Sequence, residues 1–341
     1  MAVRRPAAEP DPARAALARL LDRLPGAAVT VVGDFAADEY VFGETERVSR
    51  EAPVLIVRYE SSELKAGCAG NAALNLAALG VKVRAVGVVG EDALGAALTD
   101  VLARGGVDVS GLVRVGGRPT EAKTRVLAGG RSTRRQQMLR IDRAPSEPLP
   151  ARAEKALVQE LARAARRAGA ILASDYGSGA VGPAVKEALR RLRRDGLPVC
   201  ADSRYALPTF HGLTMVKPNE VELEAASGRA VAGPGGLERA ARALLRKVRC
   251  EMLLVTRGRN GMSLFRAGRA PVHVPAYGAM DAVDVTGAGD TVAAAFTAGL
   301  AAGGDPVDAA RLANVAGALV VRKPGTAVVP RAELAAELER P

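Results

Sequence analysis

The feature that most constrains the fold is a regular alternation of helical and extended segments in the second half of the chain. From Arg152 onwards, segments with apolar residues at helical spacing alternate with short, almost wholly apolar segments. Strands that alternate with helices pair in parallel, because each helix carries the chain back across one face of the sheet. We therefore predict an α/β fold: a doubly wound, mainly parallel sheet with helices on both faces. The expected helices are Arg152–Ala168, Pro183–Arg194, Glu220–Ala226, Leu237–Val248, Thr291–Leu300 and Val307–Val321, and the expected strands are Ala170–Ala173, Pro198–Ala201, Thr214–Val216, Met252–Val255, Met262–Arg266 and Pro271–Val274.

Three β-rich segments in the first half are followed by no helix of their own. They are Val54–Tyr59, Ala122–Leu127 and Gln136–Ile141. We predict that they form a small, separate sheet, with a mobile basic loop at residues 129–135. The expected organisation is a tail and a short helix over residues 1–25 and one domain over residues 26–335, with the small sheet built from about residues 38–64 and 118–143.

A polar, glycine-rich turn, Asp284–Asp290, runs directly into the helix of small apolar residues that begins at Thr291. Gly287 and Gly289 allow the backbone to approach a ligand closely, because they carry no Cβ. The first N–H groups of the helix and its dipole favour an anion at this place. Beside such an anion hole, Asp290 can act as a general base towards a hydroxyl that attacks a phosphate. The alternative is that Asp290 only stabilises the helix, since a carboxylate in a first turn is favoured by the dipole.

Two polar residues in the first half are candidates for sugar binding. Asn71 ends the glycine-rich segment Gly67–Asn71 before an expected helix, and it offers both a donor and an acceptor. Asp38 follows an expected strand, Val29–Val32, and its carboxylate can accept hydrogen bonds from several hydroxyl groups. Asn71 could instead be the N-cap of the helix, and Asp38 could be a turn or cap residue.

Polar clusters follow four of the predicted strands, beginning at Ser174, Asp202, Lys217 and Thr256. Ligands in open α/β sheets bind at the carboxyl ends of the strands. Several polar clusters at the same edge therefore indicate one binding crevice.

Two segments resemble the signatures of the PfkB, or ribokinase-like, family of carbohydrate kinases. Asp284–Phe296 resembles the C-terminal signature, and Ala66–Asn71 with Ala73, Gly80 and Gly90 resembles the N-terminal one. The resemblance implies that Asp290 is the base in the transfer of the γ-phosphoryl group of ATP to a sugar hydroxyl. It implies that the small sheet is a lid over the sugar site and, in a homodimer, a contact between subunits. The N–H groups expected to stabilise the transferring group are those of Gly287, Ala288 and Gly289.

The same resemblance implies roles in nucleotide and cation binding. Asn219 and Glu222 match the Asn-x-x-Glu motif that organises Mg²⁺ and phosphate through water, and Mg²⁺ prefers such oxygen ligands. A charge on a helix face is the alternative for Glu222. Thr256 and Gly258 resemble the entry to the nucleotide β-hairpin, and Asn314 resembles the position near the adenine. A monovalent cation such as K⁺ is expected near Asp284. No Gly-x-x-x-x-Gly-Lys-Ser/Thr motif is present, so ATP chemistry must use the helix terminus.

Three stretches resemble one branch of the family, the kinases of D-glycero-D-manno-heptose 7-phosphate. They are Gly33–Asp34 with Asp38–Tyr40, Arg47–Val54, and Gln136–Asp142 with Ser174–Gly177. This resemblance implies that the sugar phosphate is bound by Asp34, Asp38, Gly67, Asn71, Arg140 and Asp175. The chain departs from the branch at Cys68 and Gly70, and at Ser178, where a lysine is expected. The alternatives are a kinase for another sugar, a nucleoside or an aminocyclitol-type alcohol, and a catalytically silent sugar-binding regulator.

Composition narrows the partners and the compartment. The net charge is +11, but the chain has no Trp and few Tyr and Phe, so the basic stripe with interleaved aromatics that binds nucleic acid is not expected. No apolar run is long enough to span a membrane. The three cysteines are too few and too far apart for a disulfide framework. These features predict a cytoplasmic protein that binds neither nucleic acid nor a membrane. The resemblance to the PfkB family implies that its partners are ATP, a sugar or sugar phosphate, and a second copy of the chain.

Overall fold

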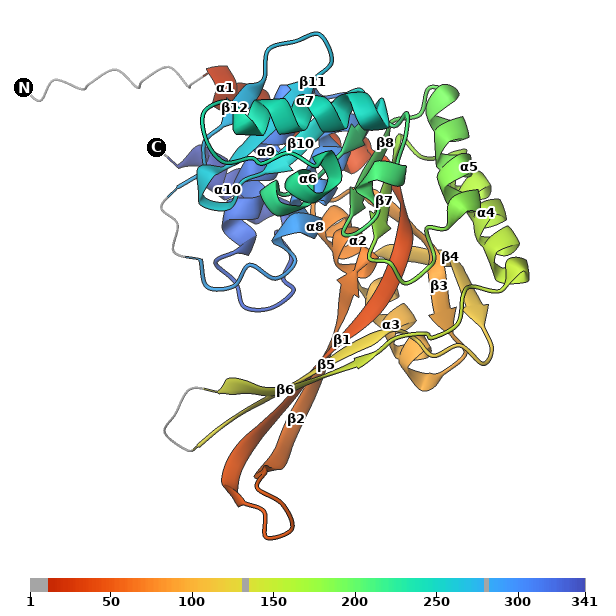
Figure 1. The fold of residues 1–341 in the computed structure, drawn as a ribbon, viewed down its shortest axis with the longest axis vertical. Helices are drawn as coiled ribbons and strands as arrows, with labels where there is room; N and C mark the ends of the chain where they lie inside the picture. Colours follow the sequence, from red (N-terminus) through yellow and green to blue (C-terminus); the bar gives the residue numbers. More distant parts are fainter. Residues whose placement is uncertain (1–11, 131–134, 279–281, 341) are drawn as a thin grey trace, which may run out of the picture.

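The computed structural model describes residues 12–130, 135–278 and 282–340. Its centre is a sheet with the strand order β12-β11-β10-β9-β8-β7-β1-β3-β4 (Figure 1). The strands from β10 to β4 in this order pair in parallel, whereas β10, β11 and β12 pair antiparallel at one edge. The predicted doubly wound, mainly parallel sheet is therefore confirmed. The strands are β1 Ala28–Val48, β3 Lys82–Gly90, β4 Val107–Val115, β7 Ala170–Asp175, β8 Val199–Ser203, β9 Met215–Val216, β10 Met252–Thr256, β11 Met262–Arg266 and β12 Val272–Val274.

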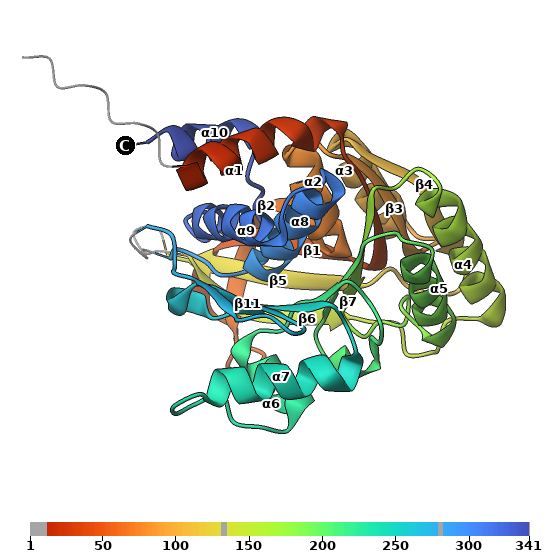
Figure 2. The same cartoon turned by 90° about the horizontal axis from the view of Figure 1, so that it is seen from above.

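Helices cover both faces of the sheet (Figure 2). One apolar core lies under α1 Pro12–Arg23, α2 Ala69–Ala78, α3 Ala93–Arg104, α8 Ala288–Ala301, α9 Pro306–Val320 and α10 Arg331–Glu339. The second core lies under α4 Ala151–Ala165, α5 Pro183–Arg194, α6 Glu220–Ser227 and α7 Gly236–Val248. Three short 3₁₀ turns complete the elements, at Leu24–Gly26, Leu207–Thr209 and Gly258–Asn260.

Helix α8 is buried on almost every side, which its composition explains. Ten of its residues, from Asp290 to Gly299, are buried. Alanine and glycine dominate this helix, so that neighbouring helices can approach closely. It packs between α2 and α9. The start of α8 is thereby fixed at the carboxyl edge of the sheet, where it meets α2.

The lid is an extension of the central sheet, which corrects the prediction of a separate sheet. Strand β1 pairs with β3 and β7 through its first residues, up to Asp34. From Phe35 onwards it pairs antiparallel with β2 Leu55–Cys68, and from Ala37 in parallel with β5 Ala122–Gly129. β5 in turn pairs with β6 Gln136–Arg143. Figure 1 shows these strands projecting from the body.

The prediction of a separate sheet failed for a physical reason. Gly33 and Asp34 read as the end of a strand, because glycine and aspartate disfavour strands. The backbone nevertheless stays extended through them, because β2 takes over the ladder that β3 and β7 leave. The strands also approach closely at Gly33, since a Cβ there would lie 2.1 Å from the carbonyl oxygen of Ser174.

Other features of the described residues bear on the sequence predictions. Helix α4 ends at Ala165, earlier than expected, and β4 and α10 were not predicted. Four residues of the loop predicted to be mobile, 131–134, lie outside the described residues. The three cysteines are free and buried. Among the described residues, every helix is too short or too polar to cross a membrane.

Candidate active site

Asp290 lies in the first turn of α8, as the sequence predicts. Its carboxylate is buried, with 3% of the residue exposed. Gly287 is the N-cap and adopts a left-handed conformation with φ of 76°. A Cβ at this position would be strained, and it would lie 2.4 Å from Nδ2 of Asn71. Only glycine therefore allows the turn to pack against α2.

The N–H groups of this turn are not equivalent. The N–H of Ala288 donates to the carbonyl of Val285 at 3.2 Å. For the N–H groups of Gly287 and Gly289, the described part of the chain shows no acceptor. Of the three amides predicted to stabilise a transferring phosphoryl group, Gly287 and Gly289 are thus the two that are available.

Asn71 on α2 contacts the glycine turn and Asp290 directly. Its Nδ2 donates to Oδ2 of Asp290 at 2.9 Å and lies 3.4 Å from the carbonyl oxygen of Gly287. Asn75, one turn further along α2, donates to the side chain of Asn71 and accepts from the hydroxyl of Thr291. Asn71 is not the N-cap of α2, because that helix begins at Ala69 after Cys68. The alternative reading of Asn71 as a helix cap was wrong.

The second oxygen of Asp290 is bound by Tyr176, whose role the sequence analysis missed. The Tyr176 hydroxyl donates to Oδ1 of Asp290 at 2.7 Å. Tyr176 belongs to the loop after β7, within the Ser-Asp-Tyr-Gly stretch at residues 174–177. The polar cluster at that strand end was the available signal, but the contact itself spans 114 residues.

Burial dominates the electrostatics of Asp290. It raises the pKa of the carboxyl above its ordinary value, although the hydrogen bonds from Asn71 and Tyr176 and the charge of Lys217 lower it. Because a general base works best with a pKa near the operating pH, a raised pKa suits this role.

A buried ion pair lies beside the same turn. Nζ of Lys217 is 3.0 Å from Oδ2 of Asp202, and 3.5 Å from the place where a Cβ on Gly289 would stand. Burial raises the pKa of Asp202 to about 7, against the lowering effect of Lys217. Burial also opposes the charge of Lys217, but Asp202 and Glu222 outweigh it and raise the pKa of the amine. A positive charge is therefore held next to the glycine turn.

Asp34 is occupied by the backbone of the Tyr176 loop. Its Oδ2 accepts from the N–H groups of Tyr176 and Ser178 at 2.7 and 3.1 Å, and its Oδ1 accepts from Ala180 at 3.0 Å. Asp175, also predicted to bind sugar, accepts from the hydroxyl of Ser203 at 2.8 Å. The carboxylates of both Asp34 and Asp175 therefore already accept hydrogen bonds from the protein itself.

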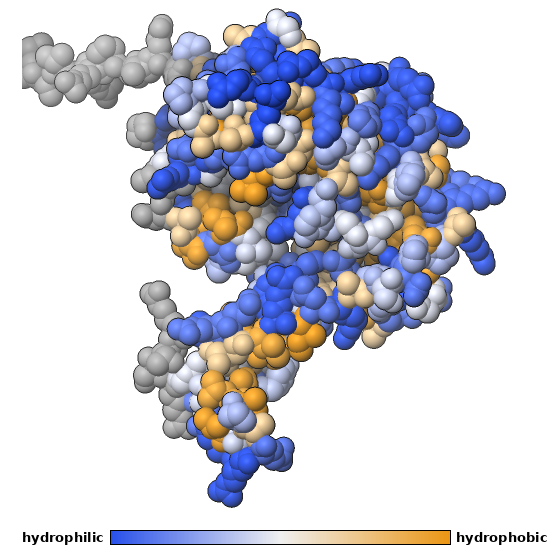
Figure 3. Space-filling view, in the orientation of Figure 1, coloured by the Kyte–Doolittle hydropathy of each residue, from blue (hydrophilic) through white to orange (hydrophobic). Residues whose placement is uncertain are grey.

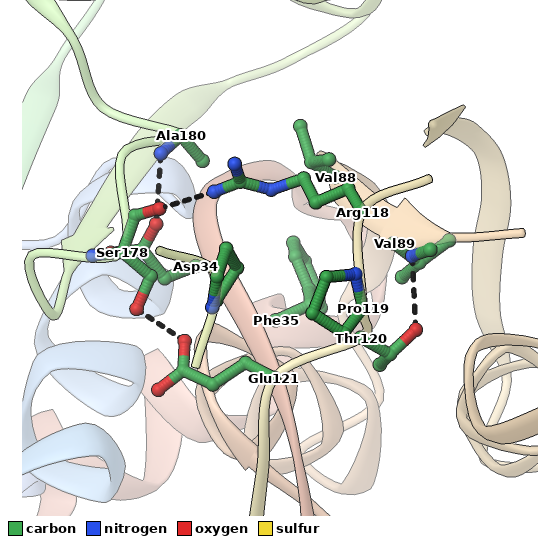
Figure 4. A pocket seen from close by; sticks show the side chains of 12 residues that line it. Asp34, Phe35, Val88, Val89, Arg118, Pro119, Thr120, Glu121, Ser178 and Ala180 are labelled. Carbon is green, nitrogen blue, oxygen red and sulfur yellow. Dashed lines mark hydrogen bonds between the residues drawn. The ribbon is translucent and has the colours of Figure 1, made fainter. Parts of the chain in front are cut away.

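A small pocket lies behind this loop (Figure 4). The Arg118 guanidinium donates to the carbonyl of Ser178 at 2.8 Å, and the Ser178 hydroxyl is bonded to Glu121. Ser178, where the resemblance leads us to expect a lysine, thus faces a carboxylate at the pocket wall.

Asp38 and Gly67 meet at the base of the lid. A Cβ on Gly67 would lie 2.6 Å from Oδ2 of Asp38, whose Oδ1 accepts from Arg125 at 2.7 Å. Figure 3 shows a hollow between the body and the lid. Arg140 lies apart from this group: it is exposed on β6 and pairs with Asp142 of the same strand.

Most of the residues predicted to bind the nucleotide lie near the start of α6 and the end of β10. Asn219 and Glu222 form a capping box at the start of α6, in which each side chain accepts from the backbone N–H of the other. Thr256 forms a β-bridge with Asn219, and the space above Gly258 is open. The local role explains the spacing of the Asn-x-x-Glu motif, and it leaves Oε1 of Glu222 without a role in the box.

Two other predicted residues are held by backbone partners. Asn314 on α9 donates to the carbonyl of Pro275 at 2.7 Å. Asp284 accepts from the N–H groups of Thr286 and Gly325 at 2.9 and 2.8 Å, which fixes the catalytic turn to the segment after α9. The described residues contain no cluster of three or more His, Cys, Asp or Glu that could hold a metal ion.

The chain is similar to known proteins in both sequence and fold. A sequence profile described as pfkB family carbohydrate kinase matches residues 26–332. The bifunctional protein HldE of Pelobacter propionicus is 40% identical over 323 residues, covering 94% of this chain and 65% of the relative. HldE of Methylococcus capsulatus is 42% identical over 314 residues, covering 91% and 63%. The chain thus spans less than two thirds of the length of these relatives.

Solved structures share the fold at low sequence identity. Arabidopsis thaliana ribokinase complexed with ribose and ATP matches with a TM-score of 0.73 at 22% identity, covering 92% of this chain and 99% of that one. Escherichia coli phosphofructokinase-2 in complex with substrates and products gives a TM-score of 0.73 at 19% identity, covering 92% and 100%. Since the profile match extends over most of the sequence, the chain belongs to the pfkB family of carbohydrate kinases.

Proposed function

We propose that this kinase transfers the γ-phosphoryl group of MgATP to D-glycero-D-manno-heptose 7-phosphate and forms the 1,7-bisphosphate. The observation that carries the proposal is the buried carboxylate of Asp290 beside the amides of Gly287 and Gly289, for which the described residues show no acceptor. A base and an anion hole at one helix terminus are what phosphoryl transfer to an alcohol requires.

In the proposed reaction, Asp290 takes the proton of the acceptor hydroxyl as that oxygen attacks the γ-phosphorus. The N–H groups of Gly287 and Gly289 stabilise negative charge on the transferring group. The ammonium group of Lys217 adds a fixed positive charge in a water-poor environment. Because little covalent chemistry falls to the protein in such reactions, positioning and electrostatics provide most of the rate.

MgATP would lie on the side of Asn219, Thr256, Gly258 and Asn314. Glu222 would hold Mg²⁺ through water with the oxygen that the capping box leaves free, and Mg²⁺ keeps several waters in such sites. When bound, Mg²⁺ neutralises charge on the phosphates. K⁺ would lie near Asp284, whose carboxylate the two backbone N–H groups hold in place.

The heptose phosphate is supported by sequence likeness to the HldE proteins and by the stretches around Asp34 and Tyr176. One observation favours a second candidate, an acceptor without a distal phosphate. Ser178 replaces the expected lysine. Its hydroxyl is bonded to Glu121, whose carboxylate is paired with Lys123 at 2.7 Å, so that position 178 itself offers no cation to a distal phosphate. We further propose that the enzyme works in the cytoplasm as a homodimer joined through the lid.

The first prediction concerns Asp290. Asp290→Asn leaves MgATP binding nearly intact but lowers turnover about a hundredfold or more, because an amide cannot take the proton. Turnover is measured by coupled ADP release and binding by calorimetry. Asp195→Asn, an exposed aspartate after α5, is the control and should behave as the wild type. Near-normal turnover of Asp290→Asn would remove Asp290 as the base.

The acceptor is tested by the same assay over a panel of sugars, sugar phosphates, nucleosides and aminocyclitols. Heptose 7-phosphate should give the highest kcat/KM. A higher value for an unphosphorylated acceptor would instead support the second candidate. ATP binding without turnover on any acceptor would point to a regulator.

A further inference from the structure

The catalytic carboxylate is held from two sides. Asn71 donates to Oδ2 of Asp290 from α2, and Tyr176 donates to Oδ1 from the loop after β7. A carboxylate offers about four acceptor sites, so each oxygen keeps one free for a substrate hydroxyl. Both bonds can therefore persist while the acceptor binds.

The loop that carries Tyr176 is firmly anchored. Asp34 accepts from three of its N–H groups, those of Tyr176, Ser178 and Ala180. Arg118 holds the carbonyl of Ser178 from the far side of the pocket (Figure 4). The backbone that positions the phenol thus cannot withdraw without breaking these four hydrogen bonds, of which that of Ala180 is buried. The anchored loop therefore holds Tyr176 beside Asp290.

The phenol can only donate to Asp290. Burial and the negative charge of Asp290 raise the pKa of Tyr176 well above its ordinary value. The hydroxyl keeps its proton at any pH at which the enzyme works, so it cannot compete with Asp290 for the proton of the substrate.

We propose that Tyr176 is the positioning residue of the general base. It fixes the orientation of the Asp290 carboxylate, and it keeps that carboxylate ionised in its buried site. Asp34 acts behind it by fixing the loop. The proposal rests on the proposed function, in which Asp290 takes a proton from the acceptor.

This role predicts a specific pH dependence. A hydrogen bond from Tyr176 favours the charged form of Asp290 and so lowers its pKa. Without the bond the pKa rises further, the base stays protonated to higher pH, and the acid limb of the kcat profile moves up. The other charged or titratable groups around Asp290 are Lys217, Asp202, Asp38 and Cys68, and they are unchanged by a substitution at position 176.

The test is Tyr176→Phe, which removes the hydroxyl and keeps the ring. With heptose 7-phosphate and MgATP, kcat should fall about tenfold, as for a lost hydrogen bond to a charge. The acid limb should move up by about one pH unit, while the KM for MgATP is unchanged. Tyr205→Phe is the matched control, because Tyr205 lies beside Gly177 of the same loop but is 75% exposed. It should leave both the rate and the pH profile unchanged.

A second variant should shift the acid limb of the kcat profile in the opposite direction. 3-Fluorotyrosine incorporated at position 176 makes the phenol a stronger donor without removing it, so the acid limb should move down. This variant tests the proposal even if Tyr176→Phe folds poorly. Unchanged acid limbs in both variants would overturn the positioning role.

The outcome is separable from that of the proposed function. If Asp290→Asn is inactive and the Tyr176 variants have a normal rate and profile, the base assignment stands and the role of Tyr176 is wrong. If Asp290→Asn is active, both the base and its positioning residue are wrong.

Discussion

At the scale of single residues, the buried charge of Lys217 deserves an experimental test of its own. The amine is almost fully buried, and its partner within reach is Asp202. Its position beside Gly289 would place it close to the phosphoryl group in the proposed reaction. The same charge also stabilises the fold, because Asp202 would otherwise be buried without a partner.

We predict that Lys217→Met lowers turnover at least tenfold, because a charge that stabilises the transition state is lost. The free energy of unfolding should also fall by about 3 kcal/mol, since removal of one partner leaves a buried charge uncompensated. Adding Asp202→Asn to the variant should restore much of the stability but not the turnover. Recovery of turnover together with stability would show that Lys217 serves the fold alone. Lys155→Met, at an exposed site on α4, is the control.

At the scale of elements, the active site is assembled by loops that strands and helices hold in place. The Tyr176 loop depends on β1, because Asp34 in that strand accepts from it. The catalytic turn depends on α2 through Asn71, and on the segment after α9 through Asp284. Asp290 is therefore positioned by several elements that are distant in the sequence.

Asp34→Ala should loosen the Tyr176 loop without disturbing the remainder of the sheet. Three N–H groups lose their acceptor, and each buried N–H left unpaired costs about 1–3 kcal/mol unless water replaces the carboxylate. Hydrogen exchange at residues 176, 178 and 180 should be faster, and turnover should fall with the positioning of Tyr176. Asp22→Ala on α1 is the control. Normal protection of these amides in Asp34→Ala would contradict the anchoring role.

At the scale of the whole molecule, the lid carries an apolar surface that the body does not cover. Exposed large apolar side chains lie on β1, on β2 and just before it, and on β6 (Figure 3); they are Val48, Val54, Leu55, Tyr59, Met138, Leu139 and Ile141. An apolar group of this size on a projecting sheet is typical of an interaction site. This observation supports the proposed homodimer.

We predict that Leu139→Glu with Ile141→Glu converts the proposed dimer into a monomer, because two charges would be buried in its interface. Sedimentation velocity measures the change. Val221→Glu is the control, since Val221 is also an exposed apolar residue but lies on α6 in the body. A wild-type chain that sediments as a monomer at micromolar concentration would contradict the proposal.

The sequence predicts the order of elements better than the contacts of the site. The α/β alternation is a local pattern, so the strands from β7 to β12 follow from it. Asp290 and its glycine turn are also local. The contact between Tyr176 and Asp290 is not a local feature, because the approach of two distant segments depends on the complete sheet. For the same reason the sequence could not show that Asp34 binds backbone and that Arg140 lies apart from the cleft.

Strand β1 belongs to both the body and the lid, and this continuity has a mechanical consequence. Asp34 and Asp38 lie on the same extended backbone as the lid residues that follow them. Because β1 is one continuous strand, the lid cannot rotate at its junction with the body as if joined by a flexible loop. A tilt of the lid would therefore also move the backbone at Asp34, which anchors the Tyr176 loop, so that the lid is coupled to the orientation of the proposed base.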